Sequence, residues 1–165
     1  MIHPLPYRDS KATGAADFYF AINATFRFIR ETLGAEALHK YWSDLGREYY
    51  APVWRRWKEG GLPAVQEYWR AFFEAEPGAV ADVLAEDGGV VLDVRICPAI
   101  RRLREGGRKI EPDFCQHCYY VSEAAAREAG LTVRIKGGNG RCRQTFHEAG
   151  SFWSPQNMEE VEQAS

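Results

Sequence analysis

The spacing of apolar residues divides the chain into a helical first half and a second half in which strands and helices alternate. Between residues 15 and 33, apolar side chains recur every three or four positions, the period of a helix with one buried face, and Gly34 ends it. A second helix is expected from about Glu36 to Lys58, broken by Pro52, and a third from Pro63 to Glu74, because proline suits a first helical turn. The first half is therefore predicted to be helical.

The hydrophobic pattern changes at Gly88. Residues 88–97 alternate apolar with mixed side chains, which is the period of a half-buried strand, and Pro98 ends it and begins a short helix closed by glycines. Residues 112–130 have a proline at the start, an Ala/Glu-rich second half and a closing glycine, and these features predict another helix.

A β-hairpin is expected at residues 131–147, because two apolar-alternating segments flank the sequence Gly-Gly-Asn-Gly. The elements together predict an α+β fold, with a helical N-terminal half packed on a small antiparallel sheet that ends in this hairpin. At 165 residues the chain has the size of one domain. Residues 1–13 are read as a lead segment and residues 148–165 as a polar, flexible tail.

The amino-acid composition narrows the classes of molecule that this protein is expected to bind. Apolar residues make up 45% and charged residues 27%, as in a globular protein, and a net charge of -2 without a basic run argues against nucleic acid. The N-terminus does not resemble a signal peptide, and no segment approaches the ~20 apolar residues that span a bilayer. We therefore expect a cytoplasmic protein without a membrane segment, and the surplus of aromatic residues in the first half makes a homodimer plausible.

In a reducing compartment, four cysteines favour thiol chemistry or metal ligation over disulfides. Cys115 falls in the first turn of the helix predicted from Pro112, where free N–H groups and the macrodipole favour an anion and lower a thiol pKa. Cys118 follows three residues later and lies on the same face of this predicted helix as Cys115. We expect Cys115 to be a catalytic thiolate, with Cys118 and Cys97 as supporting thiols. His117 points away from both neighbours on a helix, and its role stays open.

Two alternatives to a catalytic thiolate are a metal site and simple packing of the cysteines in the core. The Cys-x-x-Cys pair with Cys97 and Cys142 supplies four sulfur ligands for zinc or an iron–sulfur cluster. Free cysteine also packs as a small buried apolar residue, and Cys142 lies on the apolar face of the predicted hairpin.

Substrate-binding candidates surround the cysteines in the sequence. Polar residues on the strand face of Cys97 and at the end of the hairpin have the chemistry to orient a small polar substrate, and aromatic residues with polar edges have the bulk to line its pocket. They are Asp93, Arg95, His147, Tyr49, Tyr50 and Trp54.

Three segments, RICPAI, FCQHCYYVSEAAAREAGL and IKGGNGRCRQTF, resemble the C-terminal signature of the L-2-amino-thiazoline-4-carboxylic acid hydrolase family over about residues 90–147. The resemblance implies that Cys97, Cys115 and Cys142 match family cysteines. It also implies a hydrolase without a cofactor that opens a small cyclic amidine-like or related C–N bond by thiolate attack. The family commonly has an acidic residue at the position where this chain has Cys118. This departure from the family pattern favours the metal alternative.

The same order of strand, helix and hairpin is similar to the vinyl-reductase-like ligand-binding domains. That likeness implies a redox or small-molecule-binding module in which zinc or an iron–sulfur cluster is held by cysteines, and no catalytic role.

Overall fold

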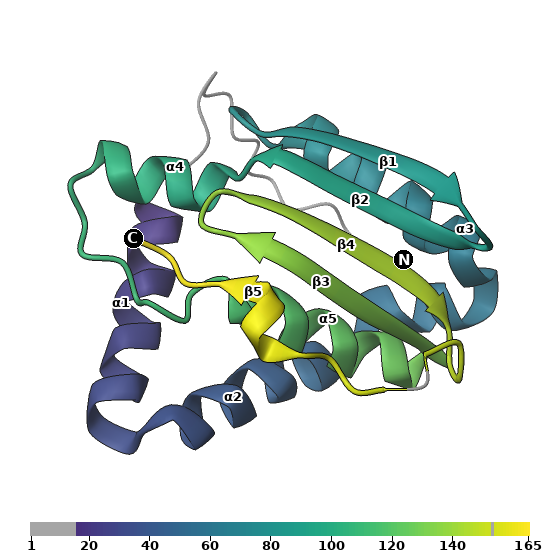
Figure 1. Ribbon diagram of the computed structural model, residues 1–165, viewed down its shortest axis with the longest axis horizontal. Helices are drawn as coiled ribbons and strands as arrows, with labels where there is room; N and C mark the ends of the chain where they lie inside the picture. Colours follow the sequence, from purple (N-terminus) through teal and green to yellow (C-terminus); the bar gives the residue numbers. More distant parts are fainter. Residues whose placement is uncertain (1–15, 153) are drawn as a thin grey trace, which may run out of the picture.

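Helices cover one face of a single sheet, and among the residues that the structure describes no α-helix lies over the other face (Figure 1). The computed structural model describes residues 16–152 and 154–165. The helices are α1 (Ala16–Leu33), α2 (Ala35–Asp44), a π-helical turn η1 (Leu45–Tyr49), α3 (Ala51–Ala75), α4 (Pro98–Glu105), α5 (Gln116–Glu128) and a 3-10 turn η2 (Met158–Glu160). The strands are β1 (Val80–Glu86), β2 (Gly89–Ile96), β3 (Leu131–Gly138), β4 (Arg141–Glu148) and β5 (Val161–Glu162).

The strands are ordered β1-β2-β4-β3-β5, and every neighbouring pair is antiparallel except β3 with β5. The predicted α+β class and the hairpin of β3 and β4 are therefore confirmed. β1 was not expected, and it forms an edge of the sheet.

Side chains that alternate along the strands form the core under the helices. Val83, Leu92, Val133 and Phe146 face inward from four strands and are almost fully buried. Aromatic rings of α3 close over Phe146, because the Trp57 ring centroid lies 5.7 Å away in an edge-to-face arrangement.

The long helix α3 contains a kink at Gly61. Gly61 has φ +61°, a backbone conformation that glycine adopts readily, and Pro63 follows. The helix expected from about Glu36 to Lys58 is therefore divided among α2, η1 and the first arm of α3, and the helix expected from Pro63 forms the second arm of α3.

The helix that carries two cysteines packs very closely on the π-helical turn. A Cβ atom built on Gly46 of η1 would lie 2.3 Å from the carbonyl oxygen of Val121 in α5. Glycine is therefore needed at this crossing, which fixes the position of α5 against the N-terminal helices.

The C-terminal segment is anchored to the sheet, in contrast to the flexible tail that was expected. Val161 is buried and pairs with Gly137, and the Gln156 side chain both accepts from the Ile135 N–H and donates to its carbonyl. Within the described part of the chain, no helix is both long and apolar enough to cross a membrane.

Candidate functional site

Four cysteines and one histidine line a single small cavity of about 30 Å³ at one end of the sheet. They come from the β2–α4 junction, the start of α5 and the beginning of β4, three segments that are far apart in the sequence. The wall consists of Cys97, Phe114, Cys115, His117, Cys118, Ile135, Gly137, Gly138, Gly140, Arg141 and Cys142. All four thiols are free.

Two of the cysteines directly precede a helix. Cys97 caps α4 and Cys115 caps α5, so each thiol lies beside the positive end of a helix. The sequence had placed Cys97 on the strand and Cys115 inside the helix. The difference arises because residues 112–115 form turns and α5 begins only at Gln116.

The turn between β3 and β4 forms part of the cavity wall and places its backbone N–H and carbonyl groups beside two of the cysteines. The Asn139 N–H donates to Sγ of Cys115 at 3.2 Å, and the Cys97 N–H donates to the Gly140 carbonyl at 2.9 Å. Gly140 has φ +107°, and a Cβ atom there would lie 3.3 Å from the Arg104 guanidinium. Gly140 therefore gives the turn a positive φ that other residues rarely adopt, and this turn brings the Asn139 N–H to Cys115.

His117 is the site residue whose role the sequence left open. Its Nδ1 lies within hydrogen-bond distance of the Phe114 carbonyl, which only accepts, so Nδ1 carries the proton. Nε2 of the neutral ring is then unprotonated, and it lies 3.7 Å from Sγ of Cys118. Burial also lowers the pKa of His117, which keeps the ring neutral.

Cys142 belongs to the inner face of the sheet. It pairs with Val94 of β2 and Gly137 of β3, and the Gln144 side-chain amide donates to its Sγ at 3.8 Å. Cys142 shares this face with Phe146, in agreement with its expected place on the apolar face of the hairpin, and the same face opens into the cavity.

Burial sets the acidity of the thiols. It raises the pKa of Cys97 to about 11 and the pKa values of Cys115 and Cys118 to about 12, and it raises that of Cys142 further. Backbone hydrogen bonds from Asn139 lower the pKa of Cys115 but do not offset this desolvation. The expectation of a lowered pKa at Cys115 is therefore wrong for the chain by itself, because the sequence does not reveal how deeply the thiol is buried.

Metal-ligand geometry is not already formed at the cavity. Among residues 16–152 and 154–165, no three His, Cys, Asp or Glu side chains are arranged so that they could hold one ion. Ligation by the cysteines therefore requires their side chains to move toward a common centre.

Three of the polar candidates lie away from the cavity. Asp93 and Arg95 are on the uncovered face of the sheet, where Arg95 forms an ion pair with Asp82 at 2.8 Å. His147 lies at the other end of β4 from Cys142, and its ring packs on Phe152 at 5.0 Å. None of the three lines the cavity.

The three aromatic candidates also lie outside the cavity, although one of them is close to it. Tyr49 is 73% exposed, and Trp54 donates from its indole N–H to the Arg47 carbonyl at 2.8 Å. Tyr50 is closer to the site: burial raises its pKa, and the neighbouring Tyr49 and Cys118 raise it further. Tyr50 therefore lies within electrostatic range of Cys118 without lining the cavity.

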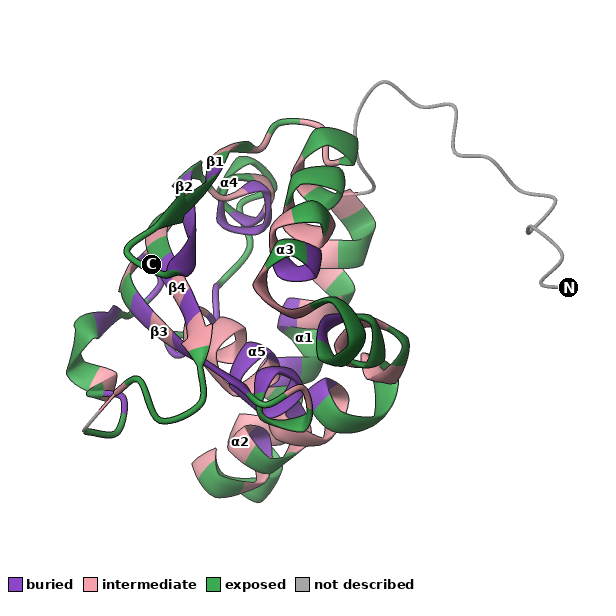
Figure 2. Ribbon diagram, turned by 90° about the vertical axis from the view of Figure 1, so that its right-hand side faces the viewer, coloured by how far each residue is buried: buried purple, intermediate pink, exposed green. Residues whose placement is uncertain are grey.

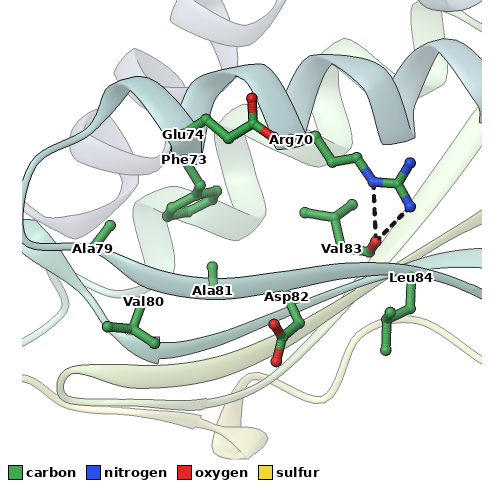
Figure 3. Close-up of a pocket in the computed structure, with 9 residues that line it drawn as sticks. All are labelled: Arg70, Phe73, Glu74, Ala79, Val80, Ala81, Asp82, Val83 and Leu84. Atoms are coloured by element: carbon green, nitrogen blue, oxygen red, sulfur yellow. Dashed lines mark hydrogen bonds between the residues drawn. The ribbon is translucent and has the colours of Figure 1, made fainter.

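A larger hollow of about 400 Å³ lies between α3 and the edge strand β1 (Figure 3). Arg70 reaches from α3 and donates from Nε and one Nη to the Val83 carbonyl, at 3.4 and 3.2 Å. The guanidinium thereby caps an acceptor on an open sheet edge, a common protection against strand pairing. The side chain of Asp82 points away from this hollow, and no cysteine or histidine lines it, so the cysteine cavity is the stronger candidate.

Neither a family model, nor a curated protein, nor a solved structure matches this chain, and the functional argument therefore rests on the cavity itself.

Proposed function

We propose that this protein is a metal-binding domain whose cysteines hold a soft cation, with zinc as the first ion to test. The observation that carries the proposal is the meeting of four thiols from three separate segments around one small cavity. Thiolates are preferred ligands of zinc and of iron–sulfur clusters.

The acidity of the thiols favours a cation as their partner. A buried thiolate without a counter-charge is costly, which is why burial raises the pKa values of Cys115 and Cys118 to about 12. A bound divalent cation would supply the missing positive charge and would release the thiol protons on binding.

The size of the cavity favours an ion over an organic substrate. About 30 Å³ has room for roughly two water-sized groups. A five-membered ring with a carboxylate is several times larger, so the cyclic substrate implied by the family resemblance would require the cavity to open.

The groups around the sulfur atoms suit an anionic metal–thiolate centre. The Asn139 N–H donates to Cys115, and helix starts lie beside Cys97 and Cys115. Hydrogen bonds and dipoles of this kind orient metal ligands and stabilise their charge. Cys97, Cys115, Cys118 and Cys142 would be the ligands, drawn to about 2.3 Å from zinc. Nε2 of His117 is a further donor within reach of the same cavity.

A second candidate is a cysteine-dependent hydrolase, and the contact between Cys118 and His117 favours it. A neutral imidazole 3.7 Å from a thiol has the position of a general base. In this alternative Cys118 would take the nucleophilic role that the sequence assigned to Cys115, and the reaction would need no metal.

Cobalt titration of the reduced, chelator-treated protein separates the two proposals. We expect one Co²⁺ per chain with a strong thiolate-to-cobalt absorption band, lost or weakened at least tenfold in affinity in Cys115→Ser and Cys118→Ser. His147→Ala is the matched control, because it removes a metal-ligating side chain that lies outside the cavity.

Circular dichroism must show that the serine variants remain folded. A folded wild-type chain that binds neither cobalt nor zinc would refute the metal proposal. Turnover of a small cyclic amidine by the chelated protein, lost in Cys118→Ser, would establish the hydrolase.

A further inference from the structure

Residues 161–165 run along the turn that joins β3 and β4, and we call this segment the strap. Figure 1 shows the strap passing from β5 toward α4 beside this turn, and Figure 2 also has the C end close to the strands of the sheet. Val161 and Ala164 are buried, at 4% and 6% exposure. Val161 pairs with Gly137 at the end of β3, and the Ala164 N–H donates to the Pro112 carbonyl at 2.8 Å. The strap is therefore held at two points, one on the sheet and one on the loop before α5.

The turn beside the strap consists largely of glycine. Gly137, Gly138 and Gly140 all line the cysteine cavity. A Cβ atom on Gly138 would lie 2.5 Å from the Glu162 carbonyl oxygen, so the strap packs directly on the backbone of the turn. Because glycine loses more conformational freedom than any other residue when it is fixed, the closed position of this turn depends on contacts that hold it.

Asn139 connects the strap to the cavity. Its side-chain Oδ1 accepts from the Ser165 N–H at 3.0 Å, and its Nδ2 donates to the Ser165 hydroxyl oxygen at 3.4 Å. The backbone N–H of the same residue donates to Sγ of Cys115 at 3.2 Å. Asn139 therefore binds the strap with its side chain and a cavity thiol with its backbone.

Arg104 of α4 joins the same two segments. Its Nε donates to the Ser165 carbonyl at 2.9 Å, and one Nη donates to the Asn139 carbonyl at 3.1 Å and also to the Asn139 side-chain oxygen. α4 begins directly after Cys97, so Arg104 belongs to another wall of the same cavity. One guanidinium thus ties together α4, the turn and the strap.

We propose that the strap, Arg104 and Asn139 form a latch that holds the glycine turn over the cysteine cavity and thereby controls the entry and release of the metal ion. This role rests on the proposed function, because it requires a metal bound by the cysteines. When the hydrogen bonds of the latch break, the turn can lift while the sheet stays folded, and Cys115 then loses the Asn139 N–H and contacts water. Arg104 and Asn139 are positioning residues, since they act on the ligand Cys115 through the turn.

Alkylation of the reduced, metal-free protein with iodoacetamide measures the opening of the turn, with the rate at Cys115 followed by mass spectrometry. Asn139→Gly removes both side-chain bonds to the strap and suits the positive φ of +50° at this position, so we expect it to raise the rate about tenfold. Arg104→Gln should have a similar effect. Arg101→Gln is the matched control, because it removes the same charge from the same helix, where Arg101 pairs with Glu105.

Two further measurements separate a latch from a general loss of stability. Opening of the turn alone exposes little surface, so the raised alkylation rate should not change at low urea concentrations. Asn139→Asp keeps the acceptor oxygen for Arg104 and the strap, and it should react near the wild-type rate. Unchanged rates in Asn139→Gly and Arg104→Gln would overturn the latch, as would a raised rate that climbs with urea from the lowest concentrations.

Transfer of zinc to a chromogenic chelator tests the control of the metal. From protein loaded with one zinc per chain, Asn139→Gly and Arg104→Gln should release zinc about tenfold faster than the wild type and Arg101→Gln. Equal release rates would overturn the latch as a metal gate. A protein that binds no zinc would refute the proposed function and this gate with it, whereas the alkylation rates still decide whether the latch holds the turn.

Discussion

Replacement of Gly46 by alanine tests whether η1 and α5 cross as closely as described. Gly46 is buried, and the backbone of Gly46 has no positive φ that would by itself disfavour alanine. The added Cβ atom would lie 2.3 Å from the Val121 carbonyl oxygen and 2.8 Å from Cβ of Ala124. The first contact is with backbone, which cannot rotate away.

Two effects of opposite sign decide the result. Alanine in place of glycine stabilises a helix by about 1 kcal/mol. The Cβ atom falls well inside the 3.0 Å that real Cβ atoms keep, so the helices must separate, and overpacking of this kind costs about 1–3 kcal/mol. Backbone contact places the cost at the upper end, and we expect a net destabilisation of about 1–2 kcal/mol. For a domain of this size, the melting temperature should fall by about 2–8 °C.

Thermal and urea unfolding measure the effect. Ala71→Gly is the control for propensity alone, because Ala71 is exposed inside α3, and it should cost about 1 kcal/mol. A melting temperature of Gly46→Ala at or above that of the wild type would show that the helices do not meet at this residue.

Three further predictions follow from the buried polar groups. Glu123 is buried and accepts from the Thr132 hydroxyl and the Val133 N–H, so Glu123→Ala should lower the free energy of unfolding by about 1–3 kcal/mol in urea titrations, and an unchanged midpoint would contradict this. The chelated protein should lose stability as pH rises above about 9 in thermal melts. The unfolded chain releases its thiol protons near the ordinary pKa of 9.0, whereas the folded chain keeps those of Cys115 and Cys118 up to a pH of about 12. Their contribution to stability is therefore complete below pH 9 and is lost between pH 9 and 12. A melting temperature that does not change over this pH range would contradict the burial of these thiols. At pH 8 the native, chelated thiols should react with iodoacetamide much more slowly than the urea-unfolded thiols, and equal rates would contradict the raised pKa values.

Local sequence patterns predicted those parts of the fold that depend on local preferences. The helical period of α1, the alternation of β2 and the glycine turn between β3 and β4 each depend on neighbouring residues, and each is present. β1 escaped prediction because only Val83 among its residues is buried, and its polar positions weaken the alternation. The pairing of Val161 with β3 depends on a contact between distant segments.

The candidate site was predicted as a set of residues but not as a geometry. The cysteines stood out by type, and four of them line the cavity. The contact of His117 with Cys118 was missed because an ideal helix separates adjacent side chains by about 100°, whereas ring length and rotamer here bring Nε2 to 3.7 Å. The acidity of Cys115 was misjudged because burial depends on the hairpin and α4, which local sequence does not position.

The most direct test of a cysteine metal centre is X-ray absorption spectroscopy of the zinc-loaded protein at one zinc per chain. The proposal predicts a first shell with three or four sulfur atoms at about 2.3 Å, which loses a sulfur in Cys118→Ser while Cys142 and the other cysteines remain. A shell of only nitrogen and oxygen ligands at about 2.0–2.1 Å would contradict it, because zinc would then be bound away from the four thiols.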